Sequence, residues 1–161
     1  MAKGKGNSEF TITDQPILFE ERFLEKYVGD KLLNDPVTAI IELIANSWDA
    51  GATEVHIQWP ETKGDDLIIT DNGSGISEGD FIKIWSTMAY DRTKINGRYA
   101  NDNDLPFKRI AFGRNGIGRF AGFCFSDNYL LTSTDKTGNG FSCNVTSKIA
   151  GKPVALTKIQ T

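Results

Sequence analysis

The segment from Val37 to Asp49 constrains the fold most, because its spacing predicts a helix that is apolar on nearly every side. At about 100° per residue, Glu42, Asn46 and Asp49 fall within about 60° of one another. The rest of the circumference carries Ile40, Ile41, Leu43, Ile44, Ala45 and Trp48. Such a wide apolar surface favours burial on most sides, and the polar stripe offers the oxygen ligands that a hard cation prefers. The alternative is a surface helix whose polar face is simply hydrated.

Turn and capping signals bound this helix and several other elements. Asp35-Pro36 begins it, since aspartate caps free amides and proline suits the first turn, and Gly51 ends it. Ser77 and Asp80 form a capping box. The predicted helices are 17–28, 35–49 and 78–85, and the predicted strands are 55–59, 67–70, 129–134 and 140–145.

The order of these elements predicts a mixed α+β two-layer sandwich with adjacent antiparallel strands. Residues 1–8 are expected to be a disordered tail, and residues 9–161 a single domain. No apolar run approaches the roughly 18 residues needed to span a bilayer, and no signal peptide is recognisable, so a cytoplasmic location is expected. Cys124 and Cys143 do not form a metal-ligand pattern and are expected to be reduced thiols.

A local basic segment lies within a chain whose net charge is -3. Residues 92–119 contain seven basic and two acidic side chains. This charge favours an anionic ligand such as a polyphosphate, although a solvated charged loop would look the same. Residues 86–112 are also too long for an ordinary connection and are predicted to be a functional loop or lid.

Two glycine turns follow predicted elements. The strand 67–70 leads into Asp71-Asn72-Gly73-Ser74-Gly75-Ile76, where an aspartate at the sheet edge could accept a hydrogen bond from an exocyclic amine such as that of adenine. A plain tight turn is the alternative. The second turn, residues 112–120, offers backbone amides and two arginines as an anion cradle, or else a glycine hinge. It lacks the Gly-Lys-Ser/Thr ending of a P-loop.

The order and spacing of these three motifs resemble the GHKL superfamily of ATPases, which includes gyrase, heat-shock chaperones of the ninety-kilodalton class, histidine kinases and MutL proteins. The motifs are Glu42 to Ala50, Asp71 to Gly75 and Gly113 to Gly118, and the resemblance extends from about Val37 to Val145. It implies a Bergerat fold, in which a mixed, largely antiparallel sheet carries helices on one face and ATP binds under a lid.

The resemblance also implies a role for each matched position. Glu42 matches the general base that polarises water, Asn46 the magnesium ligand and Asp71 the residue that reads adenine. The implied cofactor-binding residues are Asn46, Asp49, Ala50, Asp71, Gly73, Gly75, Ile76, Lys94, Gly113, Arg114, Asn115, Gly116, Ile117, Gly118, Arg119 and Phe120. Lys94 is the weaker phosphate contact, and Arg114, Asn115 and Arg119 are donors near the phosphates.

Within the superfamily, the Glu42, Asn46 and Asp49-Ala50 pattern is similar to the hydrolysing branch, and the 85–94 and 116–123 segments to Microrchidia-like and chaperone-like members. The further strands of these families, with their Gly-Thr segment, have no recognisable counterpart before Thr161. The chain is therefore expected to be an N-terminal piece of a larger protein, or else a shortened domain.

The function expected from the resemblance is Mg²⁺-dependent ATP hydrolysis that drives a conformational or dimerisation switch, slowly in the isolated domain. A non-hydrolysing nucleotide switch and a protein kinase of the same fold are the alternatives. The expected partners are ATP or ADP and a second copy of the full-length protein. Nucleic acid is not expected to bind this domain alone, because the same basic charges are needed for phosphates, and no membrane contact is expected.

Overall fold

The strands form two antiparallel sheets in the computed structural model, which describes residues 15–17, 33–85, 87, 99–100, 108–113, 116–147 and 154–159. One sheet has the order β1-β6-β5-β4 and the other is the pair β2-β3. The elements in chain order are β1 (Gln15–Ile17), α2 (Pro36–Asp49), β2 (Val55–Gln58), β3 (Ile68–Asp71), α3 (Glu78–Trp85), the 3-10 helix η2 (Gly118–Cys124), β4 (Asn128–Thr134), β5 (Gly140–Thr146) and β6 (Val154–Ile159).

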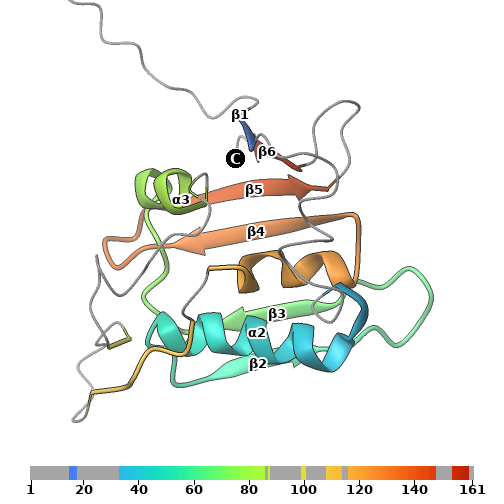
Figure 1. The fold of residues 1–161 in the computed structure, drawn as a ribbon, viewed down its shortest axis with the longest axis horizontal. Helices are drawn as coiled ribbons and strands as arrows, with labels where there is room; N and C mark the ends of the chain where they lie inside the picture. Colours follow the sequence, from blue (N-terminus) through green and yellow to red (C-terminus); the bar gives the residue numbers. More distant parts are fainter. Residues whose placement is uncertain are drawn as a thin grey trace, which may run out of the picture.

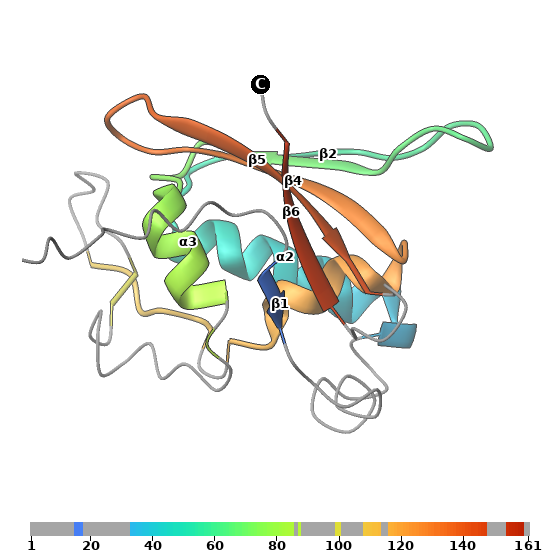
Figure 2. The ribbon, with the colours of Figure 1, turned by 90° about the horizontal axis from the view of Figure 1, so that it is seen from above.

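The expected two-layer α+β sandwich is confirmed. Seen from above, the strands form one layer, and α2, α3 and η2 lie together on one side of it (Figures 1 and 2). Every pairing between the named strands is antiparallel. No helix in the described part of the chain is long and apolar enough to cross a bilayer.

Helix α2 begins and ends where its capping residues predict. The carboxylate of Asp35 accepts hydrogen bonds from the amide of Val37 (3.1 Å) and the hydroxyl of Thr38 (2.6 Å). Pro36 occupies the start of the helix, and Gly51 follows its end with a φ of 79°. The bond from Val37 satisfies a backbone amide that has no partner within the helix, which stabilises the start of α2 at Pro36.

Two apolar clusters join the layers. In the first, Phe81 and Trp85 of α3 pack on the side chains of β5 that face the helices, Phe141, Cys143 and Val145. In the second, Ala39 of α2 meets Phe120 and Ala121 of η2. Phe123 packs against both clusters, so η2 connects α2 to the rest of the core. Both cysteines are free thiols, as expected, with Cys143 buried and Cys124 partly buried.

Strands β1 and β6 correct two expectations. The expected helix 17–28 begins at Ile17, which is instead the last residue of β1; the rest of that helix lies outside the described residues. The expectation that no further strand precedes Thr161 is wrong, because β6 pairs with β5 from Ser142↔Ile159 to Thr146↔Ala155 and with β1. Neither strand has a turn signal on both sides, and each is stabilised by pairing with a segment distant in sequence.

The connection after β3 lies close against β4. The hydroxyl of Ser133 accepts a hydrogen bond from the Ile76 amide (2.9 Å) and donates one to the Ile76 carbonyl (3.2 Å). Gly75 has a φ of 60°, and a Cβ added there would collide with the carbonyl oxygen of Thr134. The two sheets therefore approach each other at a point where only glycine fits.

Replacing Gly75 with alanine should destabilise the fold by roughly 2–5 kcal/mol, because left-handed strain adds to a backbone clash. Gly138→Ala is the matched control: Gly138 has a φ of 86°, but a methyl group at this position would have no atom within 4 Å. The control should lower the free energy of unfolding by the left-handed backbone strain alone, roughly 1–2 kcal/mol. Urea unfolding measures both, and equal losses in the two variants would contradict the close approach at Thr134.

Candidate functional site

Asp71 lies at the end of β3, where both of its carboxylate oxygens are held in place. One oxygen accepts a hydrogen bond from the Gly73 amide (2.8 Å), and the other accepts one from the hydroxyl of Ser47 on α2 (2.9 Å). The Asp71 side chain remains exposed. Each carboxylate oxygen can accept more than one hydrogen bond, so Asp71 can still take an amine donor from a ligand.

The end of α2 contacts the first glycine turn. The Ser74 amide donates to the carbonyl oxygen of Ala50 (2.8 Å). A Cβ at Gly73 would lie 2.9 Å from the Cβ of Ala50 and 2.8 Å from an Asp71 oxygen. The turn therefore packs directly against α2, and a side chain at Gly73 would displace the Asp71 carboxylate.

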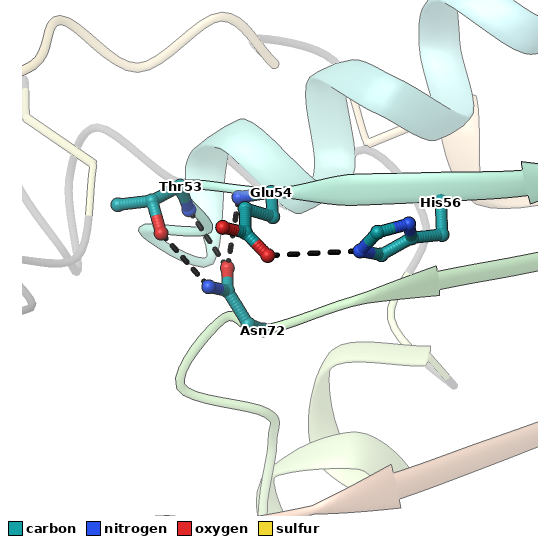
Figure 3. A network of polar contacts seen from close by, with 4 residues as sticks. All are labelled: Thr53, Glu54, His56 and Asn72. Carbon is teal, nitrogen blue, oxygen red and sulfur yellow. Dashed lines mark hydrogen bonds and ion pairs between the residues drawn. The ribbon is translucent and has the colours of Figure 1, made fainter.

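Asn72, in the same turn, binds the loop before β2 (Figure 3). Its side-chain oxygen accepts hydrogen bonds from the amides of Thr53 (2.8 Å) and Glu54 (3.0 Å), and its nitrogen donates to the Thr53 hydroxyl (2.8 Å). The loop before β2 is thereby tied to the residue after β3. His56 lies in β2, and its Nε2 is 3.6 Å from a carboxylate oxygen of Glu54.

Glu42 lies against the second glycine turn. A Cβ at Gly118 would lie 2.5 Å from a carboxylate oxygen of Glu42, which is closer than any real contact. Glu42 is partly buried, and Asn46, one turn further along α2, is exposed. Gly116 has a φ of 64°, a conformation that favours glycine. The Glu42 carboxylate therefore lies directly against the backbone of the second glycine turn at Gly118.

Asp49 accepts two hydrogen bonds from the backbone where the second turn begins. Its carboxylate oxygens bind the amides of Phe112 (2.7 Å) and Gly113 (2.8 Å), and its side chain is buried. Next to it, the indole of Trp48 donates to the Ile110 carbonyl (3.0 Å), and the guanidinium of Arg109 lies 4.3 Å from the centre of the Trp48 ring. The C-terminal end of α2 therefore holds the chain just before the glycine cluster.

Arg119 is the buried cation of this region. Its guanidinium donates to the carbonyls of Gly116, Ile84, Trp85 and Thr87. Burial lowers the pKa of Arg119 to about 10, so the side chain keeps its charge at neutral pH. The carbonyl of Arg119 accepts a hydrogen bond from the hydroxyl of Tyr129 (2.8 Å), and burial raises the pKa of that phenol well above its ordinary range.

Several predicted residues are thus brought together: Glu42 with Gly118, Asp49 with Gly113, and Ala50 with Gly73 and Asp71. Others have structural partners that occupy their side chains. Phe120 is completely buried in the core, and the guanidinium of Arg119 is bound to carbonyls. Ile76 packs beside the first cluster, and Ile117 precedes η2. Lys94, Arg114 and Asn115 lie outside the described residues. For all of the predicted site residues, contact with a nucleotide stays a prediction.

The donor set fits a magnesium ion that is held largely by a phosphate ligand. Among the described residues, no three His, Cys, Asp or Glu side chains gather as a metal site. Asn46, one helical turn from Glu42 on α2, offers one exposed amide oxygen. Mg²⁺ commonly binds through one or two protein oxygens together with phosphates and waters, so one protein ligand is compatible with such a site.

Ser47 is a site residue that the sequence analysis missed. Its buried hydroxyl donates to Asp71 and, at 3.4 Å, to the Leu43 carbonyl of its own helix. The available signal was a hydroxyl inside an otherwise apolar helix face, which requires a partner when it is buried. That signal could not identify the partner, because Asp71 lies 24 residues away.

Comparison with known proteins shows which family the chain belongs to. A family model described as "Histidine kinase-, DNA gyrase B-, and HSP90-like ATPase" matches residues 34–160. The chain is similar to the DNA mismatch repair protein MutL of Borreliella afzelii, with 39% identity over 73% of this chain and 19% of that protein. It is 25% identical to MutL of Lactobacillus acidophilus over 71% of this chain and 17% of that protein. It is 34% identical to the mismatch repair protein pms1 of Schizosaccharomyces pombe over 38% of this chain and 8% of that protein.

The chain therefore spans between 8% and 19% of the length of these relatives. The family match extends over the part of the chain that carries Glu42, Asp71 and Gly118.

Asp49→Asn should loosen the backbone at Phe112 and Gly113, because an amide can accept through only one of its two end atoms. A loss of about 1–3 kcal/mol is expected, together with faster hydrogen exchange of those two amides by NMR. Asp66→Asn, at an exposed position before β3, is the control. It should change neither the free energy of unfolding nor the exchange of these two amides. Unchanged exchange at Phe112 and Gly113 in the Asp49 variant would show that the carboxylate does not hold this segment.

Proposed function

This chain belongs to the family of histidine kinase-, DNA gyrase B- and HSP90-like ATPases, and from that premise we propose that it binds ATP with Mg²⁺ and hydrolyses the γ-phosphate. Family membership supports ATP binding and a switch driven by hydrolysis. The observation that carries the finer proposal is the contact of Glu42 with Gly118, with Asn46 one helical turn away. In this proposal Glu42 is the general base, Asn46 is a magnesium ligand and the backbone at Gly118 is part of the phosphate site.

We assign the adenine end of the nucleotide to the first glycine turn. Asp71 accepts a hydrogen bond from the exocyclic amine of adenine, while Ser47 and the Gly73 amide hold the carboxylate in place. Gly73 and Gly75 let the turn pack closely on Ala50 and Thr134 and so shape the adenine pocket. Ala50 and Ile76 line the base. Because the bonds from Ser47 and Gly73 are already formed, Asp71 needs little reorganisation on binding.

We assign the phosphates to the backbone of Gly116, Ile117 and Gly118, where N–H groups can bind anionic oxygens. Gly113 supports this segment through Asp49, which already accepts its amide hydrogen. A bound Mg²⁺ would neutralise charge on the β- and γ-phosphates, with Asn46 as its protein ligand. Glu42 accepts a proton from water and orients that water for in-line attack on the γ-phosphate.

The switch requires sequence beyond this domain. The chain covers less than a fifth of the relatives named above, and we propose that ATP binding promotes homodimerisation of a longer protein, with slow turnover in the isolated domain. Repair of DNA mismatches is a property of those relatives by name. The assignment to a Microrchidia-like or chaperone-like branch stays a prediction.

Replacing Glu42 with alanine should leave ATP binding within about threefold of the wild type and reduce hydrolysis by at least about a hundredfold, since a general base contributes about 10²–10⁴-fold. Calorimetry with a non-hydrolysable analogue and a phosphate-release assay measure the two quantities. Glu54→Ala, which removes an exposed carboxylate from the loop before β2, is the control and should retain activity. Undiminished hydrolysis by the Glu42 variant would refute the assignment of the base.

Replacing Asp71 with alanine should weaken ATP binding by roughly 10- to 100-fold, the range of one charge-assisted hydrogen bond. GTP presents a carbonyl in place of the adenine amine, so its weak binding to the wild type should change little. A competition titration with ATP and GTP measures this selectivity. If the variant loses affinity for both nucleotides equally, Asp71 does not read the base.

A further inference from the structure

Arg119 connects three elements that are distant in sequence. Its guanidinium donates to the carbonyls of Trp85 and Thr87 (3.1 Å each) and of Ile84, all at the C-terminal end of α3. Its Nε donates to Gly116 in the glycine turn. Its own carbonyl accepts the Tyr129 hydroxyl of β4. One residue thus fastens the second glycine turn to both a helix end and a strand.

These contacts leave little of the guanidinium for a ligand. A guanidinium has five N–H groups, and four of them are directed to protein carbonyls. Arg119 is only 9% exposed, and the central carbon of its guanidinium lies 5.8 and 5.7 Å from the ring centres of Trp85 and Phe120. Direct binding of a phosphate would require these bonds to break.

The charge of Arg119 is balanced by carbonyl dipoles at the end of a helix. Partial negative charge collects on the last carbonyls of a helix, and a cation there is favourable. Among the described residues, no ion pair includes Arg119. A lysine could supply the charge but could not donate four hydrogen bonds in one plane. These contacts therefore require the planar guanidinium of arginine.

The position of Gly118 depends on this fastening. Gly118 lies between Gly116, whose carbonyl Arg119 binds, and Arg119 itself, and it packs against the Glu42 carboxylate. We propose that Arg119 is a positioning residue that holds the Gly116–Gly118 turn beneath Glu42 by fastening it to the end of α3. This inference rests on the proposed function for its effect on hydrolysis, and it replaces the direct phosphate contact expected for Arg119.

The test compares Arg119→Lys with the wild type in ATP hydrolysis and in binding of a non-hydrolysable analogue. A shift of the turn by about 1 Å should lower kcat by about 10- to 100-fold, while the Kd of the analogue changes by less than about threefold. Lys83→Met removes an exposed cation from the same helix and should leave both unchanged. In a Glu42→Asp background, Arg119→Lys should lower kcat by a smaller factor, because both changes act on the same contact.

A second readout does not depend on activity. Hydrogen exchange by NMR should be faster at the amides of Gly118 and Phe120 in Arg119→Lys, while the amides of β5 keep their protection. Faster exchange throughout the protein would mean that the fold itself is weakened. In that case Tyr129→Phe, which removes only the bond to the Arg119 carbonyl, should show the local effect in milder form, and its absence would overturn the proposal.

The possible failures can be told apart. Wild-type kcat in Arg119→Lys, with hydrolysis lost in Glu42→Ala, would overturn the positioning role and leave the proposed function standing. A rise in Kd larger than the fall in kcat would identify Arg119 as a phosphate contact and also overturn it. If the wild-type protein does not hydrolyse ATP, the proposed function fails. Hydrogen exchange of the Gly118 amide then tests the positioning role alone, and unchanged protection in Arg119→Lys would overturn that role as well.

Discussion

The close approach of α2 to two glycine turns is the constraint on which the rest of the structure depends. At Gly73 the neighbour is Ala50, and at Gly118 it is the carboxylate of Glu42, and neither position has room for a Cβ. One helix therefore fixes two turns that are separated by more than forty residues of chain. Glu42 of α2 meets the second turn at Gly118, and Ser47 of the same helix binds Asp71 beside the first turn.

Two buried charges hold the second turn, and both are balanced by the backbone. Asp49 accepts two amide hydrogens before the turn, and Arg119 donates to carbonyls after it. Amides bound to an anion and carbonyls bound to a cation also orient the intervening peptide groups, which is the preorganisation that binding of a polyphosphate requires.

Local signals made much of the fold predictable from the sequence. The Asp35 cap and the Ser77–Asp80 box depend on neighbours within a few residues, and the structure confirms both, together with the strand predicted at 129–134. Strands β1 and β6 depend on distant pairing and could not be read from local pattern. The polar stripe on α2 predicted which residues gather, but the partners of Asp49 and Arg119 are backbone groups, which have no signature in the sequence. The positive charge of Arg119 suggested a contact with phosphate, whereas in the structure its guanidinium donates hydrogen bonds to backbone carbonyls.

The central claim is that one helix and two glycine turns form a single nucleotide site. The most direct measurement is a crystal structure with a non-hydrolysable ATP analogue and Mg²⁺. The account predicts the adenine amine within hydrogen-bond distance of Asp71, the metal ion on the Asn46 side chain, and the terminal phosphates at the backbone of Gly116 to Gly118 beside Glu42. An analogue bound elsewhere, or one whose phosphates lie away from Glu42 and the second turn, would contradict it.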